Sequence, residues 1–124
     1  MSIKNFVANN FTLYPNKTLT KFFNIYNILQ FKFSNINGEI DFGESYPRFV
    51  NINSDIEINT SEDIIIKAKF VGKYDESIRS FNTTIIFNDV SKINKFFNAE
   101  KLIEFFNTDN SEVYDRIFDE IKIV

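Results

Sequence analysis

The sequence predicts an α+β domain, residues 1–124, in which an antiparallel sheet of five or six strands has C-terminal helices packed on one face. Two observations lead to this fold class. Apolar and polar residues alternate with period two in several stretches before residue 88, which is typical of strands with one buried face. After residue 88 the apolar spacing becomes helical, and helices that follow a run of strands pack on one face of an antiparallel sheet. A chain of 124 residues fits one such domain.

The first strand is expected over residues 3–13, where apolar residues occupy odd positions. Its predicted buried face is formed by Ile3, Val7, Phe11 and Leu13. Residues 18–28 fit two patterns, because their apolar residues match one helical face and also alternate in part as in a strand. We expect a short helix over 18–26, with Thr18 as its N-cap, followed by a strand from Ile28 onward.

A hairpin is predicted at Asn37-Gly38, between alternating stretches at 29–34 and 39–42. Asn-Gly accepts the positive φ that both central positions of a type I′ turn require. This register places Phe33 opposite Phe42, so that the two rings stabilise the same face.

Alternation resumes over 49–58, and Pro47 before it suggests an edge strand. The clearest pair of strands is predicted at 64–70 and 81–87. The segment between them, 72–80, reads as a long polar connection, and loops are where binding residues concentrate.

Three helical stretches follow residue 88. A helix around 90–97 has Asp89 or Ser91 as a possible cap, and a second begins after Asn98. The same pattern also fits one kinked helix over both stretches. The last helix is expected over 111–123, since apolar residues recur there on one face.

The chain contains no His and no Cys. These absences exclude a Ser-His-Asp triad, a cysteine nucleophile and zinc ligation by His or Cys. General acid-base catalysis by carboxylates, Lys or Tyr is still compatible with the sequence. The candidate carboxylate pairs for it are Asp55 with Glu57 and Asp115 with Asp119. The sequence therefore predicts no enzyme, no catalytic residue, no cofactor and no metal site.

No apolar run is long enough for a signal peptide or for a membrane span. We therefore expect a cytoplasmic protein without a membrane partner. Asn, Ile, Phe and Lys make up about half of the chain, and all four have codons built only from A and T. An AT-rich genome explains this bias, so a single Asn or Phe carries less functional information than in an unbiased sequence.

Charge is segregated along the chain. Residues 1–38 carry four lysines and no acid, residues 39–63 carry seven acids against Arg48, and residues 100–120 carry seven acids against Lys101 and Arg116. An acidic face would attract a basic partner, although acids on the polar faces of strands and helices are also the default.

These features favour a small protein-binding factor, such as an inhibitor or immunity-type protein of a bacterium, phage or mobile element, that occludes the surface of another protein. Tyr and Arg are enriched at interfaces, and they occur in the 72–80 connection. The candidate partner-binding residues are Glu62, Asp63, Tyr74, Asp75, Glu76 and Arg79.

Two alternatives remain. The chain could be a structural subunit of a homo-oligomer, or of a phage or secretion particle, that assembles through sheet edges or apolar helix faces. It could also bind single-stranded nucleic acid through lysines and aromatic rings of the N-terminal third. A sequence pI near 5.0 argues against nucleic acid.

Overall fold

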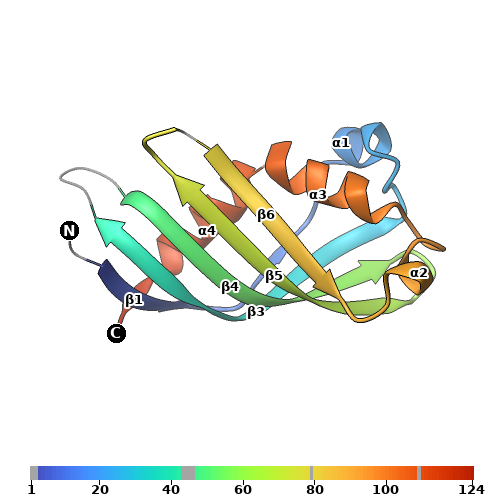
Figure 1. The fold of residues 1–124 in the computed structure, drawn as a ribbon. Helices are drawn as coiled ribbons and strands as arrows, with labels where there is room; N and C mark the ends of the chain where they lie inside the picture. Colours follow the sequence, from blue (N-terminus) through green and yellow to red (C-terminus); the bar gives the residue numbers. More distant parts are fainter. Residues whose placement is uncertain (1–2, 43–46, 79, 109) are drawn as a thin grey trace.

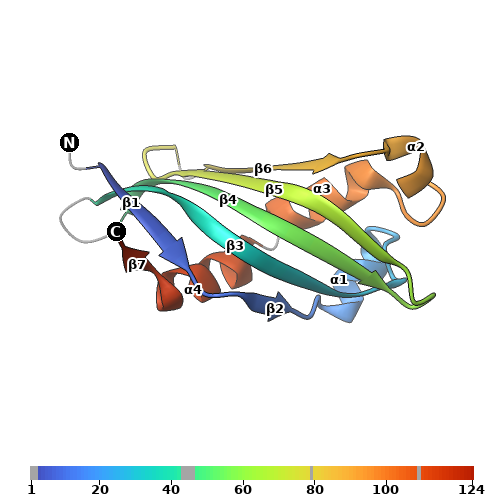
Figure 2. The same ribbon diagram turned by 90° about the horizontal axis from the view of Figure 1, so that it is seen from below.

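The computed structural model describes residues 3–42, 47–78, 80–108 and 110–124. Their elements are β1 (Ile3–Ala8), β2 (Phe11–Leu13), α1 (Lys17–Phe22), β3 (Ile28–Phe42), β4 (Pro47–Thr60), β5 (Ile65–Asp75), β6 (Ser80–Phe87), α2 (Val90–Ile93), α3 (Ala99–Thr108), α4 (Asn110–Glu120) and β7 (Lys122–Ile123). Figures 1 and 2 show the strands side by side in the order β6-β5-β4-β3-β1-β7, and β2 also pairs with β3.

The α+β class with an antiparallel sheet is confirmed, since every strand pair in the described residues is antiparallel. The sheet has seven strands and not the predicted five or six. Two of them, β2 and β7, have only three and two residues. Strands this short are too brief to show alternation in a sequence.

The predicted strand pair at 64–70 and 81–87 corresponds to β5 and β6. Ile66 and Phe70 of β5 are buried, whereas the intervening Lys67 and Lys69 are exposed. We call the face with the buried side chains the inner face of the sheet and the opposite face the outer face. The connection is shorter than expected, because β5 continues to Asp75 and pairs with β6 up to Ser80.

The predicted hairpin at Asn37-Gly38 is wrong. Residues 28–42 form the single strand β3, and Phe33 faces Ile56 of β4. The register between β3 and β4 shifts between Ser34 and Asn37, where β3 contains one extra residue, and Asn35 has a φ of 51°. This β-bulge interrupts the alternation, and the sequence pattern around it resembles a turn.

Two further expectations about the strands are wrong. In β1 the buried residue is Phe6, whereas Ile3 and Val7 are 49% and 40% exposed. Pro47 does not mark an edge, since β4 lies between β3 and β5. It is the first residue of β4, a position at which proline is tolerated in a sheet.

The helices differ from prediction at their ends. Helix α1 begins after Asn16, whose side chain accepts hydrogen bonds from the backbone of Thr18 and Leu19, and it ends at Phe22. The positive φ of Asn24, 58°, prevents the expected continuation to residue 26. The last helix ends at Glu120, and Lys122 and Ile123 pair with β1 instead of extending it.

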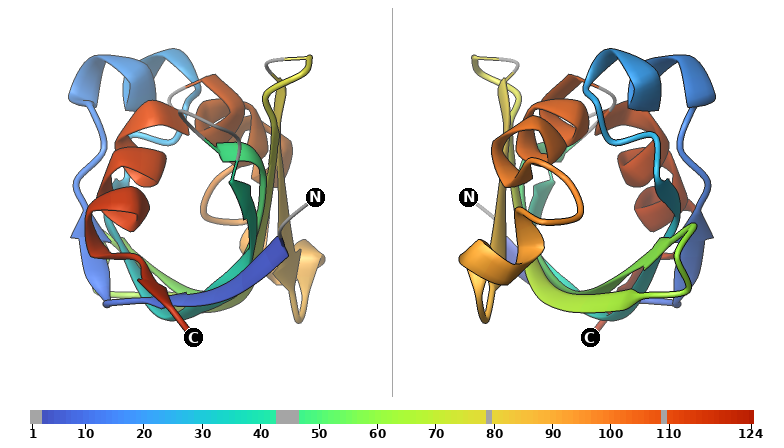
Figure 3. Two further views of the ribbon diagram at one scale, coloured as in Figure 1. Left: turned by 90° about the vertical axis from the view of Figure 1, so that its left-hand side faces the viewer. Right: turned by 90° about the vertical axis from the view of Figure 1, so that its right-hand side faces the viewer.

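The sheet is curved, as Figure 3 shows in views along the strands. The core contains a cluster of aromatic rings. Phe31 and Phe33 of β3 and Phe70 of β5 project from the inner face. Phe106 of α3 contacts all three rings, with centroid distances of 4.9, 6.2 and 5.3 Å. This cluster fixes α3 against β3 and β5, and thereby places the loop before α3 at one end of the sheet.

Candidate binding site

Five of the six predicted site residues are described by the structure, and they lie at two ends of the molecule. Glu62 and Asp63 occupy the turn between β4 and β5, whereas Tyr74, Asp75 and Glu76 lie where β5 ends. The eleven residues of β5 separate the two groups by roughly 35 Å. Arg79 lies outside the described residues. The structure therefore does not combine the predicted residues into one site.

The β5–β6 turn is organised by its own side chains. The Tyr74 hydroxyl donates to the Glu76 carboxylate, and the backbone N–H of Ser77 donates to Asp75 Oδ1 over 3.0 Å. The N–H of Glu76 donates to the Arg48 carbonyl over 2.7 Å, which ties the turn to β4. Much of the hydrogen-bonding capacity of this turn is therefore used within the protein itself.

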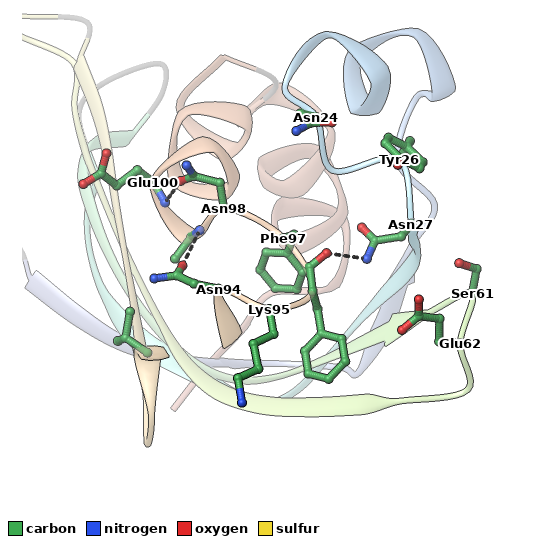
Figure 4. Close-up of a pocket in the computed structure, with 13 residues that line it drawn as sticks. Asn24, Tyr26, Asn27, Ser61, Glu62, Asn94, Lys95, Phe97, Asn98 and Glu100 are labelled. Atoms are coloured by element: carbon green, nitrogen blue, oxygen red, sulfur yellow. Dashed lines mark hydrogen bonds between the residues drawn. The ribbon is translucent and has the colours of Figure 1, made fainter. Parts of the chain in front are cut away.

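A pocket of about 790 Å³ lies at the opposite end, beside Glu62. Three segments form its walls, as Figure 4 shows: the connection from α1 to β3, the β4–β5 turn, and the stretch from α2 to the start of α3. Its lining is mainly polar and comprises Asn24, Tyr26, Asn27, Ser61, Glu62, Val90, Asn94, Lys95, Phe96, Phe97, Asn98, Ala99 and Glu100. The volume is within the range of known ligand pockets.

Asn27 joins the three walls of this pocket. Its side-chain amide donates a hydrogen bond to the backbone carbonyl of Phe96 over 2.7 Å. Its backbone carbonyl accepts a hydrogen bond from the backbone N–H of Ser61 at 2.8 Å. These contacts link segments that are far apart in the sequence. The pocket is therefore part of the folded framework and does not depend on one loop alone.

The α3 side of the pocket has no free helix N-terminus. Asn98 Oδ1 accepts from the N–H groups of Glu100 and Lys101 at 2.9 and 3.2 Å, and Asn94 Oδ1 accepts from Ala99 at 3.4 Å. The backbone donors that bind anions at other helices are satisfied here. The carboxylates of Glu62 and Glu100 further disfavour an anionic ligand.

Tyr26 is the most exposed aromatic residue of the lining, with 65% of its surface accessible. Sequence reasoning missed it, together with the four asparagines of the pocket. Asn24 and Asn27 lie in the segment 18–28, whose pattern did not distinguish a helix from a strand, and this ambiguity was the available signal. The compositional bias toward Asn concealed it.

The acids of the two acidic segments occupy several parts of the fold. Asp55 of β4 forms an ion pair with Lys69 of β5, and Glu57 lies opposite Lys67 in the same register. The described acids of residues 100–120 lie on α3 and α4, and all of them are exposed: Glu100, Glu104, Glu112, Asp115, Asp119 and Glu120. The two acids of β4 therefore face cross-strand lysines, whereas Glu62 of the β4–β5 turn and Glu100 of α3 line the same pocket.

Hydrogen bonds from Lys69 and Asn35 hold the pKa of Asp55 below its ordinary value of 3.8. A depressed folded pKa adds stability above the unfolded pKa, and this stability is lost as the pH falls through the folded value. We expect Asp55→Asn to lower the free energy of unfolding at pH 7 by about 0.2–1 kcal/mol, as for exposed ion pairs. Urea titrations at pH 7 and well below pH 3.8 measure this, and the difference between the two proteins should disappear at the acidic pH.

Lys69→Ala provides the control for that titration. In this background Asp55→Asn should have a much smaller effect at pH 7, because its main partner is gone. An equal effect in both backgrounds would show that the ion pair is not responsible.

The described residues contain no group of three or more His, Cys, Asp or Glu side chains placed to hold a metal ion. Across the same ranges, no helix has both the length and the apolar character needed to cross a membrane.

No family model matches the chain, and no curated protein or solved structure shows significant similarity to it. The function must therefore be argued from the surface of the molecule.

Proposed function

We propose that this chain is a small, non-enzymatic protein-binding factor of the inhibitor or immunity type, acting by occlusion of a partner surface. Its contact surface is the end of the molecule that contains the pocket beside Tyr26 and Glu62. A bacterial, phage or mobile-element origin and a cytoplasmic location remain part of this proposal.

Exposed aromatic residues at this end carry the proposal. Tyr26 is 65% exposed and Phe22, two residues before Asn24 of the pocket, is 80% exposed. Large aromatic side chains dominate the binding energy of protein interfaces. The phenyl ring of Phe22 has no polar group that could form a hydrogen bond with water. A partner that covers this ring therefore removes apolar surface from water, which stabilises the complex.

We also infer that α3 and α4 together cover the inner face of the sheet. The buried side chains of Phe105 and Phe106 in α3 and of Val113 and Ile117 in α4 support this. The inner face is then occupied, and a partner has the ends and the outer face of the sheet available.

Charge at the pocket end fits a partner with a basic surface. Glu62 and Asp63 are exposed in the β4–β5 turn, and Glu100 lies across the pocket from Glu62. Lys95 is the opposing cation in the lining, and it makes no ion pair within the described ranges. Negatively charged side chains that surround the exposed Tyr26 attract positively charged residues at the edge of a partner's contact surface.

The proposal predicts that Tyr26→Ala weakens partner binding at least about tenfold, as expected for an aromatic hot spot. Tagged wild-type protein is used to capture partners from a lysate of the organism that encodes it, and these are identified by mass spectrometry. Affinities of the purified partner for wild-type protein and variants are then measured by calorimetry.

Ile78→Ala is the matched control, because Ile78 is 68% exposed and lies in the β5–β6 turn at the other end. It should bind as the wild type does. If Ile78→Ala and Asp75→Ala weaken binding while Tyr26→Ala does not, the site is the β5–β6 turn and the pocket end is wrong. Failure of every captured protein to bind in purified form would contradict the function itself.

A further inference from the structure

Strand β6 forms one edge of the sheet. It pairs with β5 along residues 80–87 and has no strand on its other side in the described part of the chain. Figures 1 and 3 show this edge along the side of the molecule. An edge strand presents a row of backbone donors and acceptors to which another strand can bind.

The sequence of β6, Ser-Phe-Asn-Thr-Thr-Ile-Ile-Phe, lacks the residues that usually prevent such pairing. It contains no charge and no proline, and β-branched and aromatic residues dominate it. Short uncharged segments with high β propensity associate readily with copies of themselves. On its outer side Ile86 is 54% exposed.

A side chain from α3 occupies the centre of this edge. The backbone N–H of Thr83 donates to Asn107 Oδ1 over 3.0 Å. The N–H and carbonyl of one residue point to the same side of a strand, and neighbouring residues alternate. The backbone groups of Ile85 and Phe87 therefore face the same free side as those of Thr83.

We propose that β6 is a pairing edge for the β6 strand of a second copy of this chain, and that the Asn107 side chain holds this edge closed. A second copy is the favoured occupant because two uncharged strands meet without like-charge repulsion. This proposal is independent of the partner-binding function above.

The backbone geometry fixes the register of such a pair. Two antiparallel copies centred on Thr84 place Thr83 of one copy opposite Ile85 of the other. The Thr83 N–H then donates to a carbonyl of the second copy in place of Asn107 Oδ1. On the outer face, Thr84 lies opposite Thr84 at the two-fold axis, and Ile86 lies opposite Asn82.

Asn107→Ala should strengthen dimerisation about fivefold or more, because the competing hydrogen bond is removed. Asn107 is exposed, so the substitution does not open a cavity. Sedimentation equilibrium of wild type and variant across a concentration series measures the dimerisation constant, and circular dichroism verifies the fold. Asn107→Asp keeps an acceptor for Thr83 and should behave as the wild type does.

The double variant Asn107→Ala with Thr84→Lys tests the surface itself. Two lysines would then face each other at the two-fold axis, and like charges directly opposite in a sheet are destabilising. We expect this variant to lose the gain in dimerisation. An Asn107→Ala protein that associates no more than the wild type overturns the proposal, and so does a double variant that dimerises as strongly as Asn107→Ala.

Discussion

Phe106→Ala is expected to lower the free energy of unfolding by about 3–5 kcal/mol. The side chain is 0% exposed, and its centroid lies 4.9 Å from that of Phe31 and 5.3 Å from that of Phe70. These rings project from β3 and β5, which are held in place by the hydrogen bonds of the sheet. The surrounding structure therefore relaxes little, and a cavity remains. Equilibrium unfolding in urea, followed by circular dichroism, measures the loss.

Phe22→Ala is the matched control, since it removes the same atoms from a side chain that is 80% exposed. Its effect on the free energy of unfolding should stay within about 0.5 kcal/mol. Similar losses for both variants would mean that Phe106 is not in the centre of the core.

The strands that follow simple alternation were predictable from the sequence. β5 and β6 have regular inner faces, and β4 shows its buried residues at Ile52, Ile56 and Ile58. The start of α3 was also predictable, because Asn98 caps it as expected. In each of these cases local side-chain pattern and tertiary burial agree.

The errors arise where tertiary structure overrides a local signal. Asn37-Gly38 has the composition of a type I′ turn, yet it lies inside a strand whose alternation is interrupted by a bulge at Asn35. In β1, Val7 has high β propensity but lies on the exposed face, while Phe6 fills the core. A sequence shows which residues are apolar and does not show which face the rest of the sheet covers.

The candidate site shows the same limit. Glu62 was named from its position in an acidic turn, and the structure places it in the lining of the pocket beside Tyr26. The other walls come from residues about 35 and 30 positions away in the sequence, such as Asn27 and Asn94. Only the register of the strands and the packing of α3 bring these segments together, and neither can be derived from local pattern.

Gly38→Ala is expected to lower the free energy of unfolding by about 1–3 kcal/mol through overpacking. A Cβ at this position would lie 1.8 Å from the carbonyl oxygen of Asn51 and 3.0 Å from the ring of Phe6. The carbonyl belongs to the backbone of β4, so it moves only if the two strands separate. This close approach, and not a positive φ, explains a glycine in the interior of β3.

Gly72→Ala in β5 is the matched control, because it adds the same methyl group to the same kind of element. Its nearest neighbours are the rings of Phe70 at 3.2 Å and Phe81 at 3.4 Å, which can shift by a few tenths of an ångström. We expect a loss clearly smaller than that of Gly38→Ala. Amide hydrogen exchange adds a local measurement, since separation of β3 from β4 should accelerate exchange around Asn51 more than around Lys73. Equal losses of stability and equal exchange in the two variants would contradict the close approach at Gly38.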